Sequence, residues 1–282
     1  KKEFYACNSR SDIFYDYPLN LEQLSNFEEF KKDVKNLKNK KNLTDLASAK
    51  SFEEYVEKLV GQNLSKAFFK EYPEKLWGIK TSEMSSEWAP KRIRLAQKKE
   101  KFFDDEFTAI GKRGTGEVME RLGFEAERNG CEIFTECKVL GLSLKNLDNR
   151  TTIDSIKTSN QGEIKVEDND LVIITIPITK ALKLIGQSID LKFRGTLSLY
   201  LEVDKEIGII PDGYDWLYFQ NKKEIVNRLC SPTKWSKDID KKGLGRKLLA
   251  AEISVDHDIK PKEIKEKVQE GLSNLEKLIK NK

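Results

Sequence analysis

The spacing of apolar residues changes along this 282-residue chain, and this change limits its fold more than any other feature. Between residues 20 and 100, apolar side chains recur every three or four positions, which is the period of an amphipathic helix. Between residues 191 and 254 they alternate with polar ones, which is the period of a strand with one buried face. The pattern therefore predicts an α+β fold with a helical subdomain and an antiparallel β-sheet subdomain.

Two polar side chains in the first region are placed to cap helices. Asn20 stands three residues before Gln23, and Ser51 stands three residues before Glu54. In such a capping box the first side chain accepts a hydrogen bond from a backbone N–H of the first helical turn. Both positions predict a helix start, and Gly61 is expected to end the second helix.

The middle of the chain mixes both periods. A glycine-rich loop, Gly111–Gly116, opens a helix, and the polar stretch 155–167 predicts an exposed β-hairpin. Residues 171–176, LVIITI, are apolar on both faces, which predicts a central strand, and Pro177 then begins a helix. Apolar residues between 264 and 278 predict a C-terminal amphipathic helix.

Composition argues against several classes of protein. The chain has 51 basic and 47 acidic residues, a net charge of +4, which is weak support for a nucleic-acid partner. No apolar run approaches the roughly 18–20 residues of a membrane span, and no signal peptide is recognisable. The four cysteines form no CxxC pair and there is one histidine, so no metal site is expected. These features predict a cytoplasmic protein.

The stretch 68–95, FFKEYPEKLWGIKTSEMSSEWAPKRIRL, gathers aromatic and basic residues in what reads as a turn-rich connection. Aromatic faces stack on planar rings, and arginine forks match phosphate or carboxylate oxygens. Tyr72 and Trp77 would then form two sides of a slot for a planar ring, with Arg92 supplying a charge. The alternative is that Trp77 and Trp88 fill a helical core while the arginines are solvated outside.

Part of this stretch also resembles a known family. Residues 72–78, YPEKLWG, followed by residues 88–93, WAPKRI, resemble the Y-T-E-K-x-W-G and W-A-x-x-R-I segments of flavoproteins related to UDP-galactopyranose mutase and protoporphyrinogen oxidase, within the amine-oxidase-like superfamily. Pro73 stands where those proteins have threonine. Segments 14–19 and 51–55 also resemble the family, and the downstream order follows it, so the resemblance covers nearly the whole chain.

The resemblance implies roles for four residues. In the mutases the matching tyrosine and tryptophan line the uridine site and the matching arginine reaches the substrate, which implies substrate binding by Tyr72, Trp77 and Arg92. Arg228 resembles a sheet arginine that points toward the flavin and the sugar. On the residues alone, an exposed strand arginine is an equal reading of Arg228.

The resemblance also implies FAD as the cofactor of the complete protein, near Gly111, Gly114 and Gly116. From the residues alone, a plain turn before a helix explains these glycines better than a phosphate cradle. No catalytic residue is identified.

The departures from the family concern the flavin site itself. The chain has no G-x-G-x-x-G turn after a first strand, and the family's C-terminal flavin-contacting segment is missing. The resemblance therefore implies the middle of such a protein, a fragment whose FAD site is incomplete. Residues 171–176 and the helix after Pro177 would be a strand–helix remnant of a Rossmann-like FAD domain.

The predicted organisation has four parts: an extended lead-in, 1–19; a helical subdomain, 20–100; an FAD-domain-like helix and strands, 101–190; and an antiparallel sheet with a C-terminal helix, 191–282. A homo-oligomer or missing chain segments would cover the exposed edges of the central strand.

Two functions remain open from the sequence. The first is the substrate-binding portion of an FAD-dependent oxidoreductase or mutase acting on a small molecule, either a nucleotide-sugar or another cyclic substrate. The second is a non-enzymatic module, inactive as a fragment, that uses the Tyr72–Trp77 surface to bind a partner or a glycan.

Overall fold

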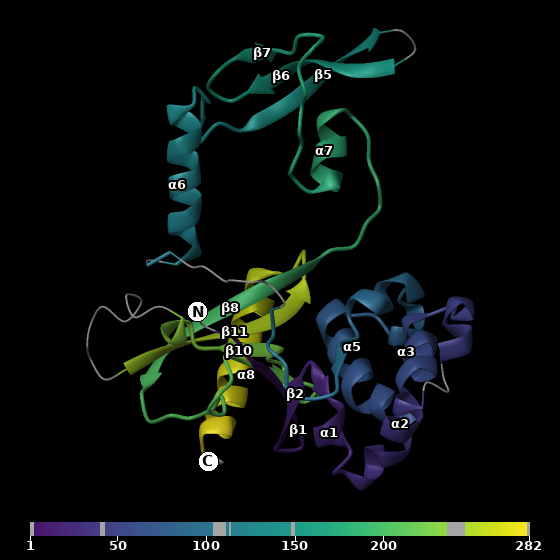
Figure 1. The fold of residues 1–282 in the computed structure, drawn as a ribbon. Coiled ribbons are helices and arrows are strands. Elements are labelled where there is room, and N and C mark those ends of the chain that lie inside the picture. The colour runs from purple at the N-terminus through teal and green to yellow at the C-terminus, as the bar shows by residue number, and fades with distance from the viewer. Residues whose placement is uncertain are drawn as a thin grey trace. The chain divides into compact units, whose positions relative to one another are not determined.

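A computed structural model describes residues 3–39, 43–103, 111–112, 114–147, 150–235 and 246–280. The chain divides into two compact units (Figure 1): unit 1 is formed by residues 1–118 and 194–282, and unit 2 by residues 119–193. Unit 1 contains a six-stranded sheet and unit 2 a three-stranded one.

The sheet of unit 1 has the strand order β2-β1-β9-β10-β11-β8. Its strands are β1 (Ala6–Arg10), β2 (Ile13–Tyr17), β8 (Arg194–Asp204), β9 (Trp216–Phe219), β10 (Arg228–Cys230) and β11 (Arg246–Asp256). Neighbouring strands are antiparallel, except that β1 and β9 are parallel. The sheet is mixed rather than purely antiparallel because the predicted lead-in, residues 1–19, supplies β1 and β2.

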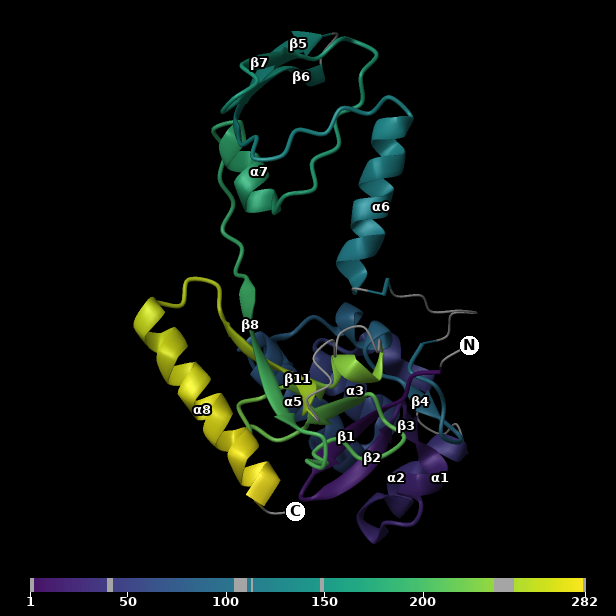
Figure 2. The same ribbon diagram turned by 90° about the vertical axis from the view of Figure 1, so that its left-hand side faces the viewer.

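The C-terminal helix α8 (Pro261–Lys280) covers one face of this sheet, beside β8 and β11 (Figure 2). Leu275 of α8 is buried in the same apolar cluster as Ile253 of β11. A Cβ atom at Gly271 would lie 2.6 Å from Ile253 Cδ1, so glycine permits the helix to approach closely. The predicted C-terminal helix is confirmed. No described helix, α8 included, is both long and apolar enough to cross a membrane.

The helical part of unit 1 consists of short elements around one apolar core that includes Phe30, Phe52 and Leu64. The helices are α1 (Leu21–Leu24), α2 (Glu28–Lys38), α3 (Phe52–Val60), α4 (Gln62–Leu64) and α5 (Glu71–Trp77). The 3-10 turns are Leu43–Ser48, Thr81–Glu83 and Ser86–Lys91, a π-helical turn covers Ser65–Lys70, and β3 (Leu19–Asn20) pairs in parallel with β4 (Leu95–Ala96).

Both predicted helix caps are present. Asn20 Oδ1 accepts hydrogen bonds from the backbone N–H groups of Glu22 (3.0 Å) and Gln23 (3.2 Å), and Ser51 Oγ accepts one from the N–H of Glu54 (3.2 Å). The helix after Asn20 is interrupted between α1 and α2, however. The side chain of Gln23 accepts a hydrogen bond from the backbone N–H of Asp16 instead of completing a capping box.

The chain around Tyr72 is helical, which differs from the predicted turn. Pro73 has no N–H, and in a regular helix its ring would crowd the carbonyl of Phe69 four residues earlier. A π-helical turn, Ser65–Lys70, precedes this point, and Pro73 lies in the first turn of α5, where proline is tolerated. Tyr72 and Trp77 therefore both lie on α5.

Unit 2 is built on an antiparallel sheet of β5 (Val139–Leu147), β6 (Arg150–Thr158) and β7 (Glu163–Lys165), with α7 (Ile178–Leu184) and the part of α6 (Thr115–Arg128) that follows Val118. The predicted hairpin is confirmed by β6 and β7, which a turn with Gly162 at φ +71° connects. The helix predicted after Pro177 is confirmed by α7.

The predicted central strand 171–176 is wrong for this structure. The segment pairs with no strand among the described residues, and Leu171 and Ile173 are 84% and 75% exposed. An extended segment becomes a strand only when its N–H and C=O groups find a neighbouring backbone, and its apolar character cannot supply one. The strand–helix remnant of a Rossmann-like domain is therefore not confirmed.

Asp33 of α2 connects two helices of the core. It is 6% exposed, and its Oδ2 atom accepts hydrogen bonds from the backbone N–H groups of Asn63 (2.9 Å) and Leu64 (3.0 Å). These N–H groups belong to α4, which is too short to satisfy them itself. Gly61, at φ +89°, lets the backbone pass the carboxylate.

We expect Asp33→Ala to lower the free energy of unfolding by about 1–3 kcal/mol, because two N–H groups would lose their acceptor. Urea unfolding measures this loss. The control is Glu28→Ala, which removes an 87%-exposed carboxylate from the same helix and should stay within about 0.5 kcal/mol of wild type. Equal losses in the two variants would contradict this role of Asp33.

Candidate functional site

A cavity of about 360 Å³ lies in unit 1 between the six-stranded sheet and the helical elements. Aromatic side chains from both sides line it, among them Tyr17, Phe68, Tyr72, Phe102 and Tyr218. The polar lining comes mostly from the sheet: Asn8, Thr196, Gln220, Asn227, Arg228, Glu252 and Ser254. Arg92 adds a positive charge from the helical side. The cavity thus combines ring-binding surface with polar groups, as ligand sites commonly do.

Four of the sheet residues form one row. Asn8 on β1, Tyr218 on β9, Arg228 on β10 and Glu252 on β11 are register partners across four neighbouring strands, so their side chains stand on one face. Arg228 donates twice to Glu252, from Nε to Oε2 (3.1 Å) and from Nη2 to Oε1 (2.6 Å). This two-point contact fixes the plane of the guanidinium group at the cavity.

The tyrosines of the cavity are neutral phenols near pH 7. Burial raises the pKa of Tyr72, and the neighbouring Tyr218 raises it further. Burial also raises the pKa of Tyr218, while Arg228 opposes that shift. The Tyr72 and Tyr218 rings meet edge to face at 5.8 Å, and Phe102 is stacked on Tyr218 at 6.4 Å. The cluster offers ring faces and O–H groups rather than negative charge.

Arg92 and Trp77 are placed differently from each other. Arg92 lines the cavity, with its Cζ atom 5.1 Å from the centre of the Trp88 ring. Trp77 is 39% exposed, does not line the cavity, and meets Trp88 edge to face at 5.6 Å. Residues five apart on a helix point roughly 140° apart, which is why Tyr72 faces the cavity and Trp77 does not. The two rings therefore do not form two sides of one slot.

The structure thus brings Tyr72, Arg92 and Arg228 to one cavity. Trp88 lines the cavity as well. Its ring centre lies 5.1 Å from that of Phe52 in the helical core, which is the place that the alternative interpretation predicted for it. Glu252 was missed, since a single acidic residue in an alternating strand gives no signal of its partner.

Two buried amide groups were also missed. Gln220 Nε2 donates to Asn8 Oδ1 (2.6 Å), and Asn227 Nδ2 donates to Ser254 Oγ (2.5 Å). The carbonyl oxygens of the same two amides, Gln220 Oε1 and Asn227 Oδ1, are buried and have no hydrogen-bond partner in the described structure. Asn227 directly precedes Arg228, and both line the cavity although successive residues of a regular strand face opposite ways.

Lys75 connects α5, which supplies Tyr72 to the cavity, with the segment between β9 and β10. Burial lowers its pKa to about 7, whereas Glu224 and Glu71 raise it. A neutral amine has only two N–H groups, so contact with more than two acceptors favours the ammonium form. Its Nζ atom lies within hydrogen-bond distance of four backbone carbonyls, one at the end of β9 and three in the connection to β10: Phe219 (2.8 Å), Asn221 (3.2 Å), Glu224 (2.9 Å) and Val226 (3.0 Å).

The predicted glycine loop lies apart from these residues. Gly114 has φ +105° and its N–H donates to the carbonyl of Gly111 (2.9 Å), which makes a tight turn. A Cβ atom at Gly111 would lie 2.5 Å from the carbonyl oxygen of Gly114, so the turn itself requires a small residue there. A Cβ atom at Gly114 or Gly116 would meet nothing within 4 Å. None of the three glycines lines the cavity.

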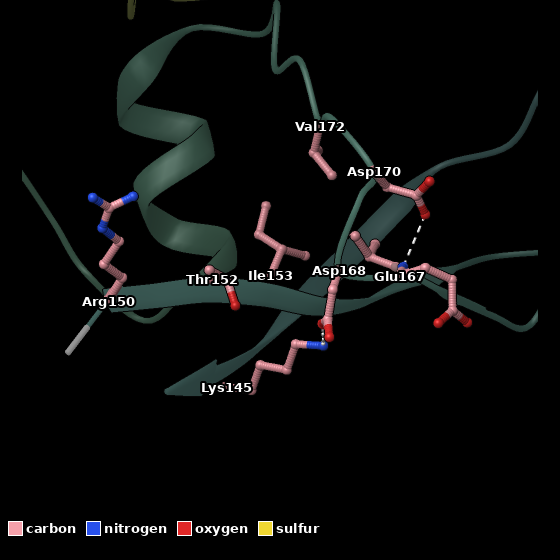
Figure 3. A pocket seen from close by; sticks show the side chains of 9 residues that line it. Lys145, Arg150, Thr152, Ile153, Glu167, Asp168, Asp170 and Val172 are labelled. Atoms are coloured by element: carbon pink, nitrogen blue, oxygen red, sulfur yellow. Dashed lines mark hydrogen bonds and ion pairs between the residues drawn. The ribbon is translucent and has the colours of Figure 1, made fainter. Parts of the chain in front are cut away.

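A second hollow, of about 630 Å³, lies on the sheet of unit 2 (Figure 3). Lys145 contacts Asp168 at 2.8 Å and Asp154 at 3.7 Å, and Asp170 accepts a hydrogen bond from the backbone N–H of Glu167 (2.8 Å). The side chain of Asp168 is 69% exposed. Because these exposed charged groups already pair with one another, a ligand would gain little by contacting them. The hollow is therefore a weaker candidate than the cavity of unit 1, although it is larger.

Comparison with known proteins gives a match at the level of structure. No protein-family model and no curated protein sequence matches the chain. Among solved structures, reduced UDP-galactopyranose mutase superimposes with a TM-score of 0.65 and 16% identity, over 91% of this chain and 57% of that one. A Pyrococcus furiosus protein superimposes with a TM-score of 0.64 and 15% identity, over 99% of this chain and 66% of that one.

At these identities the likeness shows a shared fold. The chain spans less than two thirds of the length of either structure. The structural likeness agrees with the expected scaffold, and function has to be argued from the cavity.

We expect Lys75→Met to lower the free energy of unfolding by about 1–3 kcal/mol, because the carbonyls around Nζ would lose their shared donor. Urea unfolding checks this. Lys70→Met is the matched control, since Lys70 is 45% exposed, pairs with Glu53 and should change stability by no more than about 0.5 kcal/mol. A Lys75→Met protein as stable as the control would show that the contact contributes little.

Proposed function

We propose that the cavity of unit 1 is the substrate-binding part of an FAD-dependent oxidoreductase or mutase, and that its substrate is a nucleotide-sugar. One observation carries the proposal: Tyr72, Arg92 and Arg228, which are far apart in the sequence, line the same cavity. The shared fold with UDP-galactopyranose mutase supports it, because that protein is named for a nucleotide-sugar.

In this proposal the aromatic cluster receives the base. A uracil-like ring would pack against Tyr72, Tyr218 and Phe102. The ring centre of Tyr218 lies 5.8 Å from that of Tyr72 and 6.4 Å from that of Phe102. Because both phenols are neutral, they would not repel an anionic ligand.

The two arginines would bind the diphosphate. Arg92 is exposed and has no ion pair among the described residues, so its guanidinium is available at the rim of the cavity. Arg228 uses two of its five N–H groups for Glu252, and the guanidinium also interacts with the hydroxyl of Tyr218. Its remaining N–H groups are held in a fixed direction, which suits a bound oxygen atom.

FAD is proposed as the cofactor, and it would supply the redox or covalent chemistry while the protein supplies binding and orientation. The candidate contacts in this chain are Gly111, Gly114 and Gly116. The open space at Gly114 and Gly116 permits a flat ligand to approach the backbone. Open backbone alone does not fix a ligand, and we assign no chemical step through the flavin.

We expect the full-length protein to bind UDP, and Arg92→Ala and Arg228→Ala each to weaken that binding by about ten- to a hundredfold. Loss of one charge-assisted hydrogen bond corresponds to about 1.5–3 kcal/mol. Isothermal calorimetry measures the affinities.

Arg246→Ala is the control for this experiment. Arg246 lies on β11 near Glu202 and Asp204, is 55% exposed and does not line the cavity. Its loss should leave UDP affinity unchanged. Unchanged affinity in both cavity variants would remove the diphosphate proposal and favour an apolar cyclic substrate.

The alternative function is a non-enzymatic binding module. The observation that favours it is the exposure of Trp77 (39%) and Ile79 (41%) near the end of α5, outside the cavity. Exposed apolar residues of this kind often mark a contact surface.

An FAD difference spectrum separates the two functions. We expect the visible absorbance of FAD to shift on addition of the full-length protein, because a flavin that leaves water for a protein site changes its surroundings. Trp77→Ala, which alters the exposed surface but not the cavity lining, should give the same shift. An FAD spectrum that the wild-type protein leaves unchanged would favour the binding module.

A further inference from the structure

We propose that Tyr5, Tyr214 and Asp16 form a binding site for a quaternary ammonium group, and that the ligand displaces Lys99, which occupies the site in this structure. We call Tyr5, Tyr214 and Asp16 the cation cage. None of the three lines the cavity of unit 1, so this inference is separate from the nucleotide-sugar proposal. Its basis is the way in which two rings and a buried carboxylate surround one ammonium group.

The ammonium group of Lys99 lies against two tyrosine rings. Its Nζ atom is 3.8 Å from the centre of the Tyr214 ring and 5.1 Å from the centre of the Tyr5 ring. Both distances are within the roughly 6 Å over which a ring attracts a cation. Asp215, which follows Tyr214 in the chain, fixes the backbone of Tyr5: the N–H of Tyr5 donates to Asp215 Oδ2 (3.1 Å), and the carbonyl of Tyr5 accepts from the N–H of Asp215 (2.7 Å). The two rings are therefore held beside each other by backbone contacts.

Asp16 supplies the negative charge of the cation cage. It is 5% exposed, its Oδ2 atom accepts a hydrogen bond from Asn20 Nδ2 (2.9 Å), and its Oδ1 atom accepts one from the hydroxyl of Tyr214. These neutral donors orient the carboxylate but leave its charge in place, and a buried charge is unfavourable unless a cation pairs with it. Among the described residues, Lys99 is the one cation that forms an ion pair with Asp16.

Lys99 satisfies this site incompletely. The 3.9 Å between its Nζ atom and Asp16 Oδ1 is too long for a hydrogen bond, and no described residue accepts one from Nζ. The three N–H groups of the ammonium must therefore be satisfied by water. A quaternary ammonium group has the same charge but no N–H group, so it loses no hydrogen bond when it enters. Aromatic rings beside a negative charge are the surroundings in which proteins bind choline-like cations.

Lys99 is also held weakly. Its side chain is 41% exposed, and it lies in the segment 97–101, which follows β4 and is neither helix nor strand. An ion pair with an exposed partner contributes little stability, so the side chain can leave the cation cage at low cost. A ligand that takes its place keeps Asp16 paired with a cation. The geometry thus indicates a preformed cation site with an occupant that a better-matched cation can replace.

The test titrates choline into the full-length protein by isothermal calorimetry. The second ligand is the neutral analogue of choline, in which a tert-butyl group replaces the trimethylammonium group, so that shape is kept and charge is lost. We expect Lys99→Ala to bind choline about tenfold more tightly than wild type, because the ligand no longer competes with Lys99. Both proteins should bind the neutral analogue about tenfold more weakly than choline, so the preference for charge can be measured in wild type without any substitution.

Two substitutions of Tyr5 in the Lys99→Ala protein test the ring itself. Tyr5→Leu removes the ring and should weaken choline binding by about five- to tenfold. Tyr5→Phe keeps the ring and loses only the hydroxyl that donates to the exposed Glu3 (2.9 Å), so it should keep the affinity. Lys98→Ala is the matched control for Lys99→Ala, because it removes an exposed lysine from the same segment and should leave choline affinity at the wild-type value.

Three results would overturn the cation cage as a ligand site. They are the absence of choline binding to both wild type and Lys99→Ala, equal affinities for choline and its neutral analogue, and equal losses in Tyr5→Leu and Tyr5→Phe. In support, choline should raise the melting temperature of Lys99→Ala more than that of Lys98→Ala, since a ligand stabilises the folded state that binds it. UDP affinity should be the same in Lys99→Ala and wild type, so failure here leaves the nucleotide-sugar proposal untouched.

Discussion

The cavity of unit 1 depends on one buried cation. Lys75 reaches from α5 to the connection between β9 and β10, where its Nζ atom lies within 3.2 Å of four carbonyl oxygens. Tyr72 precedes it on α5, and Arg228 begins β10, so the contact sets the separation of a helical wall and a sheet wall. Backbone carbonyls that curve around a point charge can be satisfied by an ammonium group but by no apolar side chain.

Features fixed by neighbouring residues could be predicted from the sequence. The caps at Asn20 and Ser51 require only residues within three positions, and Gly61 ends its helix through its own backbone angle. Features that need distant partners could not. Residues 171–176 have the composition of a buried strand, but a strand also requires neighbouring backbone, and apolar composition does not provide it.

The residues of the cavity also divide into those that the sequence could predict and those that depend on distant parts of the chain. Tyr72, Arg92 and Arg228 could be named from the family resemblance, because it matches individual residues of the sequence and does not depend on the fold. Trp77 could not be placed, since its direction depends on whether the chain at Pro73 is a turn or a helix. Gln220, Asn227 and Glu252 carry no local signal at all, because strand register decides which of them stand beside Arg228. Sequence could thus name single lining residues, whereas the register of the sheet decides which polar groups stand beside them.

The charges that line the cavity are unevenly distributed. Arg228 is paired with Glu252, so the row on the sheet is nearly neutral. The phenols beside it are neutral near pH 7 as well, and burial moves their pKa further above its ordinary value. The side chains of this pair are 35% and 31% exposed, so the pair contributes little stability, yet it holds two N–H directions in place. Arg92, at the exposed rim, is then the one lining cation without an acidic partner in the described part of the chain. In the proposed complex an anionic group would therefore meet unpaired positive charge at Arg92, and Arg228 would add the N–H groups that Glu252 leaves unused.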